Sequence, residues 1–163
     1  MKKGFLFLLL FLFSNAVISQ DNFVSTWAIP SDNYSFELPL KDYANITIDW
    51  GDDNTDSNVT GGGFPTHIYS SDGTKTITVQ VNDSAKDIGK MYMNGNHASR
   101  TLIRTIENWG EGKWETFYAA FKGATNLTIP ATDEPDLSLT TNMRWAFRDC
   151  TSLVGTTLND WNT

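Results

Sequence analysis

The sequence predicts a mainly β protein, in which a small antiparallel β-sandwich is followed by the start of a repeat solenoid. Short runs of β-branched and aromatic residues, separated by turn residues, predict the sandwich. A second pattern, which recurs in the C-terminal part with a period of about 26 residues, predicts the solenoid. A short apolar run at the N-terminus predicts that the chain is exported.

Residues 1–19 have the order of a secretory signal peptide. Lys2 and Lys3 precede an unbroken apolar run, 5–13, and small or polar residues follow up to Ser19, where we expect cleavage. A transmembrane anchor is the alternative, but the run is far shorter than the roughly 20 apolar residues that span a bilayer. We therefore expect a secreted protein or one of the outer cell surface, with no transmembrane span.

The charge balance argues against one class of partner. The chain carries 12 Lys and Arg against 19 Asp and Glu. Residues 1–19 hold two lysines and no acidic residue, so their removal leaves 10 basic side chains against 19 and a net charge of −9. Such a surface repels phosphate backbones, and we expect no nucleic-acid partner. Cys150 is the single cysteine, so packing rather than an intrachain disulfide must stabilise this chain.

Residues 20–96 are expected to form the sandwich. Four runs are rich in β-branched and aromatic residues and predict strands: 23–27, 34–38, 46–50 and 76–81. In 46–50 and 76–81 the apolar residues occupy every second position, which places one face on a core and the other in water. Glycine- and aspartate-rich stretches between these runs predict loops.

Residues 97–163 contain the internal repeat. The segment 117–127 aligns with the segment 143–153, with identical residues at four positions. Apolar residues at i, i+3 and i+4 predict one short helix in each copy, and a leucine then opens a short strand. The positions expected to form a shared core are Trp109, Phe117, Phe121, Leu127, Met143, Phe147, Leu153 and Trp161.

A short helix and a short strand in a single repeat unit cannot bury an apolar face alone, whereas stacked copies can. Two unrelated amphipathic helices are the alternative, but the match extends over the helix and the strand parts of both copies. Trp161 stands two periods after Trp109 and begins a unit that is not completed, so we expect the full-length protein to carry further repeats.

The first region resembles the polycystic-kidney-disease (PKD) type of β-sandwich domain. The resemblance rests on Ile48-Asp-Trp-Gly-Asp-Asp53, His67-Ile-Tyr69, Gly73 and the run 76–81. The family reads roughly aromatic-Gly-Asp-Gly, then His-x-Tyr, then a glycine before an alternating strand. Here Asp53 replaces the second glycine, which affects the turn rather than the fold. The resemblance implies an Ig-like antiparallel sandwich and brings no catalytic residues.

The second region is similar to the BspA-like leucine-rich repeat surface proteins. The similarity rests on Phe117-x-x-Ala-Phe-x-Gly-Ala-x-Asn-Leu127 and Met143-x-x-Ala-Phe-x-Asp-Cys-Thr-Ser-Leu153, with tryptophan motifs on either side. It implies a non-catalytic, adhesive surface protein that binds protein or glycan ligands on other cells or matrix. The alternative is a carbohydrate-binding accessory region of a larger extracellular enzyme.

The loop after the third predicted strand holds the candidate metal ligands. Asp52, Asn54 and Asp56 alternate as in a calcium loop, but Ser57 and Gly63 stand where an EF-hand needs Gly and Glu. Only a weak, irregular Ca²⁺ site remains, and a solvated turn is the favoured interpretation. A glycosidase pair is disfavoured as well, because an exposed turn offers neither a cleft nor burial. No cofactor is otherwise expected.

Three tryptophans are candidate ligand-contacting residues: Trp27, Trp114 and Trp145. If exposed, they would stack on sugar rings or anchor a protein partner. Burial is the favoured alternative, because large aromatic side chains are highly buried on average. Cys150 aligns with Ala124 at a small core position and is expected to be inert.

Overall fold

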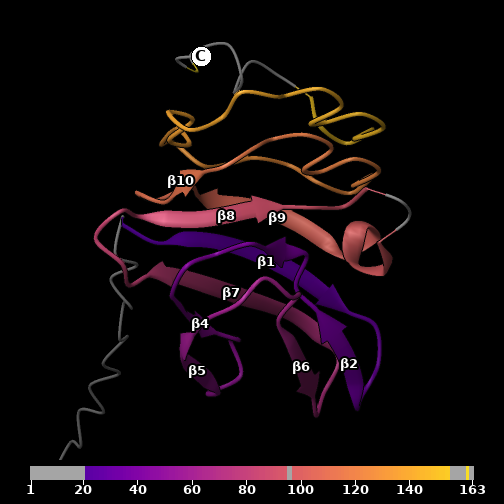
Figure 1. Ribbon diagram of the computed structural model, residues 1–163. Coiled ribbons are helices and arrows are strands. Elements are labelled where there is room, and N and C mark those ends of the chain that lie inside the picture. Colours follow the sequence, from indigo (N-terminus) through magenta and orange to yellow (C-terminus); the bar gives the residue numbers. More distant parts are fainter. Residues whose placement is uncertain (1–20, 95–96, 155–160, 162–163) are drawn as a thin grey trace, which may run out of the picture.

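The computed structural model describes residues 21–94, 97–154 and 161 (Figure 1). The predicted signal peptide and all of the third repeat unit except Trp161 lie outside these residues. The described chain is mainly β, with the 3-10 turn η1 (Ala98–Thr101) as its one helical element. Its strands are β1 (Phe23–Ile29), β2 (Tyr34–Glu37), β3 (Leu40–Lys41), β4 (Ile46–Asp49), β5 (Thr55–Val59), β6 (Thr66–Tyr69), β7 (Gly73–Val81), β8 (Asp87–Met91), β9 (Ile103–Asn108) and β10 (Lys113–Trp114).

The strands form open sheets consistent with a β-sandwich. The largest is antiparallel throughout and has the order β5-β4-β7-β1-β9. Two smaller sheets, β10-β8-β3 and β2-β6, supply the other strands. The four predicted runs coincide with β1, β2, β4 and β7, so the antiparallel β prediction is confirmed for this part of the chain.

Alternating side chains explain why the largest sheet has one buried face. Ile46 and Ile48 of β4 are fully buried, and they pair in register with Val81 and Val79 of β7. Thr47 lies between them and points to the less buried face. Because side chains alternate along a strand, this register places the aliphatic residues on the core and the polar residues outside.

The turn after β4 requires a glycine for two reasons. Gly51 has φ +73, and a Cβ at this position would overlap the backbone of Thr76 in β7. The neighbouring Trp50 is fully buried, and its carbonyl accepts a hydrogen bond of 2.8 Å from the Tyr69 hydroxyl. The sequence motif around Trp50 therefore holds a loop tightly against the sheet.

Two further segments extend the sheets: the first pairs with strands of the sheets, and the second lies against the first. We name residues 103–127 the first stacked segment and residues 128–154 the second. β9 pairs with β1 on one side, and on the other side Thr105 forms a parallel bridge with Thr128. β10 pairs in parallel with β8 on one side, and on the other side Lys113 forms a parallel bridge with Asp136. Figure 1 shows the orange and yellow parts of these segments that follow β10 lying above β8, β9 and β10.

The short helices predicted in the two repeat copies are wrong. Ala119 (φ 52) and Gly123 (φ 79) in the first copy, and Trp145 (φ 64) and Asp149 (φ 65) in the second, have left-handed backbone conformations. A right-handed helix cannot continue through such residues. Four-residue turns replace it, with N–H groups that donate back to the carbonyl three residues earlier, as Ala120 does to Phe117.

Bonds between the segments are the physical reason for this difference. Alternate N–H groups of the first segment, at residues 117, 119, 121 and 123, donate to carbonyls at 142, 144, 146 and 148. Their distances are 2.8 to 3.1 Å. In a helix these groups would point along its own axis, so they could not reach a neighbouring segment. The strand predicted from Leu127 is likewise reduced to the bridge at Thr128.

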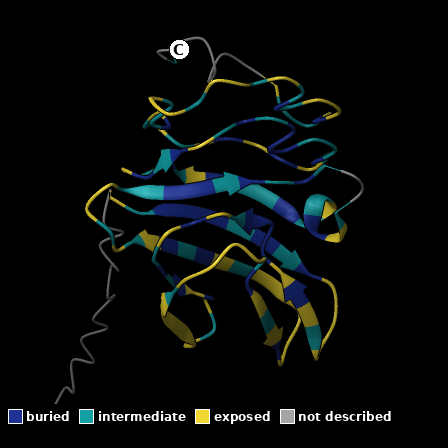
Figure 2. Cartoon of the chain, in the orientation of Figure 1, coloured by how far each residue is buried: buried dark blue, intermediate teal, exposed yellow. Residues whose placement is uncertain are grey.

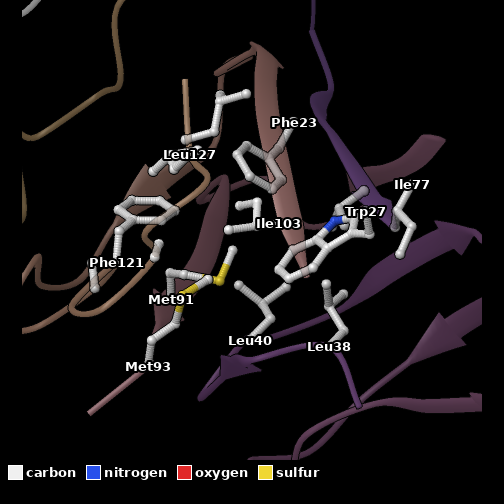
Figure 3. Packing of buried hydrophobic residues seen from close by; sticks show 14 of the residues in the cluster. Phe23, Trp27, Leu38, Leu40, Ile77, Met91, Met93, Ile103, Phe121 and Leu127 are labelled. Carbon is white, nitrogen blue, oxygen red and sulfur yellow. The ribbon is translucent and has the colours of Figure 1, made fainter. Parts of the chain in front are cut away.

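The apolar core continues from the sheets into the stacked segments. Figure 3 shows Trp27 and Ile77 of the large sheet at one end and Phe121 and Leu127 at the other. Trp109 joins the two parts, with its ring 6.1 Å from Phe23. β9 and β10 follow the boundary predicted at residue 96 and yet pair with strands that precede it. Strand β9 therefore belongs both to the large sheet and to the first stacked segment.

Candidate functional site

The second stacked segment separates its side chains into an inward and an outward set. Ala146 and Cys150 are buried, and Met143 and Phe147 are partly buried against the first segment. The outward set comprises Arg144, Trp145, Arg148 and Asp149. Trp145 and Asp149 have left-handed backbone conformations, which turn the chain between Met143 and Ala146 and between Phe147 and Cys150. The backbone therefore directs the outward polar and aromatic side chains to the surface.

One indole ring gathers three positive charges, and we name this group the Trp145 cluster. It consists of Trp145, Tyr118, Lys122, Arg144 and Arg148. The Arg144 guanidinium carbon lies 4.1 Å from the centre of the Trp145 ring, Lys122 Nζ lies 5.0 Å from it, and Arg148 Cζ lies 5.4 Å from it. The Tyr118 ring lies 5.8 Å away.

Few opposite charges compensate this cluster. Arg148 Nε lies 3.6 Å from Asp149 Oδ2, in a pair whose two side chains are both more than half exposed. Such exposed pairs contribute little, about 0–1 kcal/mol. Lys122 Nζ donates to the neutral Asn94 side chain at 3.4 Å. The indole face attracts the cations but does not neutralise their charge. The cluster is therefore a positive surface on a chain of net negative charge.

A hollow of about 290 Å³ opens beside the Trp145 cluster. It is lined by Met93, Arg100, Thr101, Lys122, Gly123, Thr125 and Asp149. Lys122 belongs to both features, and Asp149 of the hollow forms an ion pair with Arg148 of the cluster, so the two features adjoin one another. The hollow presents guanidinium, ammonium, hydroxyl and carboxylate groups around a small apolar floor.

The structure removes two of the three candidate ligand-contacting tryptophans. Trp27 and Trp114 are fully buried, so the prediction that they contact a ligand is wrong and the alternative of burial holds. Trp27 packs on Phe36 within the sandwich, at 5.1 Å between ring centres. Trp114 packs on Phe23 at 5.2 Å. Trp145 is partly exposed and is the one of the three at the surface.

The residues expected to form the repeat core lie on the inward side of the two segments. Trp109, Phe117, Phe121 and Leu127 are fully buried in the first segment. Met143, Phe147, Leu153 and Trp161 are partly buried and pack against the same cluster. Phe121 and Phe147 stack almost in parallel, with their ring centres 5.4 Å apart and an interplanar angle of 3°.

The three calcium candidates take part in different local interactions. Asp52 Oδ2 lies 2.8 Å from His67 Nε2, whereas Asp56 Oδ2 accepts a hydrogen bond of 2.9 Å from the Trp50 indole. The Asn54 side chain donates to the Asp52 carbonyl at 3.2 Å. Burial opposes ionisation of Asp52, but hydrogen bonds from His67 and Asn54 outweigh it and hold the pKa of Asp52 below its ordinary value. Over the described residues, no three His, Cys, Asp or Glu side chains gather as metal ligands.

Sequence reasoning missed the cations of the candidate site. One signal was present, because Lys122 and Arg148 are equivalent positions of the repeat and both are basic. Arg144 aligns with Tyr118, which is not basic, and Arg100 lies outside the aligned copies. Their approach to the site depends on turns that the helix prediction did not include.

No family model, curated protein or solved structure matches this chain. The resemblances to PKD-type and BspA-like proteins therefore stay predictions. Within residues 21–94, 97–154 and 161, no helix is long and apolar enough to cross a membrane.

Proposed function

We propose that this chain is a non-catalytic binding module of a secreted or cell-surface protein, which recognises protein or cell-surface macromolecules. Its architecture in this proposal is a PKD-like sandwich followed by the first repeats of a BspA-like leucine-rich solenoid. The Trp145 cluster with its adjoining hollow is the observation that carries the binding function. The proposal includes no catalytic residue and no cofactor, and a weak Ca²⁺ site at Asp52, Asn54 and Asp56 stays a prediction.

The spacing of the backbone hydrogen bonds supports a solenoid. Phe121 donates to Ala146, Trp114 donates to Asp136, and Ile106 donates to Thr128, each across about one repeat period. Parallel pairing of successive units is how a solenoid extends its core along one axis. The stacked rings of Phe121 and Phe147 support it too, because equivalent residues of two copies fill neighbouring places in one core.

The composition and setting of the Trp145 cluster support recognition. Tryptophan, tyrosine and arginine are the residues that most often dominate binding energy at protein interfaces. Here they project from backbone that is bonded to the segment below, as Ala119 N–H is to the Arg144 carbonyl at 3.0 Å. A rigid support lowers the entropy lost on binding.

The test is a binding screen of the chain from Gln20 to Thr163 against extracellular matrix proteins, whole cells and a glycan array. We expect a ligand whose affinity falls at least about tenfold on Trp145→Asn, because truncation of a central aromatic commonly costs more than about 1 kcal/mol. Asparagine tolerates the left-handed conformation, so the variant removes the ring and keeps the turn.

Lys75→Gln is the matched control, since Lys75 also lies over an aromatic ring, that of Tyr69 at 5.6 Å, but in the sandwich. Binding that is unchanged by Trp145→Asn would refute this site. Substrate turnover by the purified chain would refute the non-catalytic proposal.

Export is tested separately. We expect a secretion-competent host to release the chain with Gln20 as its N-terminus, measured by mass spectrometry of the intact protein. Retention of residues 1–19 would contradict the signal peptide.

The second candidate function is a carbohydrate-binding accessory region, favoured by the mixed polar lining of the hollow. Hydroxyl, carboxylate and guanidinium groups together match sugar hydroxyls, which both donate and accept hydrogen bonds. Selective binding on the glycan array, with no protein ligand, would favour this candidate over adhesion to proteins.

A further inference from the structure

We infer that the hollow and the Trp145 cluster together form a subsite for a single sugar residue that bears a carboxylate. The inference rests on the proposed binding function and names the chemical class of the ligand. Three features of the described residues carry it: the size of the hollow, the mixture of its polar groups, and the concentration of positive charge in the adjoining Trp145 cluster, which shares Lys122 with the hollow.

The size of the hollow selects a small group. Its volume, about 290 Å³, is just below the roughly 300–1,000 Å³ typical of small-molecule sites. It therefore accommodates one ring rather than a folded peptide. Gly123 contributes to this space, because a Cβ there would come within 3.1 Å of Arg100 Cδ and displace that side chain.

The polar groups of the hollow match a polyhydroxylated ring. Arg100 and Lys122 donate, Asp149 accepts, and the hydroxyls of Thr101 and Thr125 do both. Sugar hydroxyls need donors and acceptors side by side. The Asp149 carboxylate would repel a second acidic group placed next to it, which disfavours a run of acidic residues in a peptide.

The positive charge of the adjoining cluster selects a charged sugar over a neutral one. Lys122, which also lines the hollow, converges with Arg144 and Arg148 on the Trp145 ring, and within the described part of the chain only Asp149 forms an ion pair with one of them. A carboxylate bound beside Lys122 would relieve the repulsion among these cations and would accept charge-assisted hydrogen bonds. The net negative charge of the remaining surface disfavours a long polyanion, so one acidic residue at the end of a glycan is the ligand that fits.

The experiment titrates the isotope-labelled chain with methyl β-glucuronide and follows the Trp145 indole N–H and the Gly123 amide by NMR. We expect saturable shifts with a Kd on the order of 1 mM. Methyl β-glucoside has the same ring without the carboxylate and should bind at least about tenfold more weakly. Lys122→Gln and Arg144→Gln should each weaken glucuronide binding about tenfold, because each removes a charged donor.

Lys75→Gln should leave glucuronide binding unchanged, and thermal unfolding checks that every variant is folded. Equal affinity for the glucoside would overturn the role of the charge. Equal or tighter binding of a triglutamate peptide would overturn the sugar in favour of an acidic peptide, and no saturable shift would overturn the subsite. If the screen finds a partner whose binding depends on Trp145 while glucuronide fails, the binding function stands and this inference alone falls.

Discussion

The sandwich and the stacked segments bury the same kinds of residue by different backbone devices. In the sandwich, strands such as β1 and β7 pair over seven residues, and alternation directs one face to the core. In the stacked segments, turns with left-handed residues direct every third or fourth side chain inward, and alternate backbone N–H groups donate from one segment to the next. A continuous apolar core thus does not require continuous secondary structure, provided that the backbone polar groups find partners in the neighbouring segment.

The two regions differ also in how completely the core is covered. Figure 2 shows buried residues in strands β1, β4, β7 and β9 of the large sheet, whereas partly buried and exposed residues predominate in the second stacked segment. Phe117 and Phe121 are fully buried, but their repeat equivalents Met143 and Phe147 are only partly so. Burial decreases with distance from the sheets, because the sandwich covers the first segment and the first segment covers the second.

The largest expected effect concerns this gradient of burial. Phe121→Ala should lower the free energy of unfolding by about 3–5 kcal/mol, because a fully buried ring leaves a cavity. Phe147→Ala should cost less, about 1–2 kcal/mol, since part of the ring already contacts water. Urea unfolding measures both. Losses below about 1 kcal/mol at both positions would count against a shared core between the segments.

A second comparison uses one glycine from each region. Gly51→Ala should cost roughly 2–4 kcal/mol, because the new methyl group would overlap the β7 backbone in addition to straining φ. Gly123→Ala should cost about 1–2 kcal/mol, since only the flexible Arg100 side chain must move. Thermal unfolding gives the ranking. Equal losses would mean that the segment at Gly123 is held as rigidly as the sheet.

One carboxylate adds a side-chain link to the backbone hydrogen bonds between the two segments. Asp133 accepts hydrogen bonds from the N–H groups of Trp109, at 2.9 and 3.0 Å, and Gly110, at 2.8 Å. Asp133→Ala should lower stability by about 2 kcal/mol, because it leaves these donors without their charged acceptor. Asp133→Asn keeps one oxygen acceptor and should lose about half as much. If alanine and asparagine are equally tolerated, the carboxylate does not hold the segments together.

The smallest effect is a chemical probe of the second segment. Burial raises the pKa of the Cys150 thiol to about 11, and the thiol donates to the Phe121 carbonyl at 3.0 Å. Only the thiolate reacts, so alkylation by iodoacetamide at pH 8 should be roughly a thousandfold slower than for a free thiolate and should accelerate up to about pH 11. Mass spectrometry follows the reaction. Fast labelling at pH 8 in folded protein would show that the second segment opens while the sandwich stays closed.

The sequence predicted four strands of the first region, β1, β2, β4 and β7, because their signals are local. The alternation in 46–50 and 76–81 matches β4 and β7, since a period of two residues follows directly from strand geometry. Strands β3, β5, β6, β8, β9 and β10 escaped prediction. Most of them pair with distant partners, as Leu40 pairs with Met91, and runs of two to six residues carry little pattern of their own.

The candidate site was predicted least well. Trp145 was among three tryptophans with no local feature to separate them, and burial of Trp27 and Trp114 depends on contacts with Phe36 and Phe23 from other strands. Burial of an aromatic side chain is a property of the assembled fold, so the sequence could name the three candidates but could not choose among them.

By itself, the sequence determined the β character of the first region, the periodic recurrence in the second, and the apolar positions that face inward. These follow from period and composition, which act within a few residues. Only the tertiary structure decided that the recurring segments are turns rather than helices, because an i, i+3, i+4 pattern fits both. The choice depends on N–H groups such as that of Phe121, which bonds to the Ala146 carbonyl in the next segment rather than to a carbonyl of its own turn.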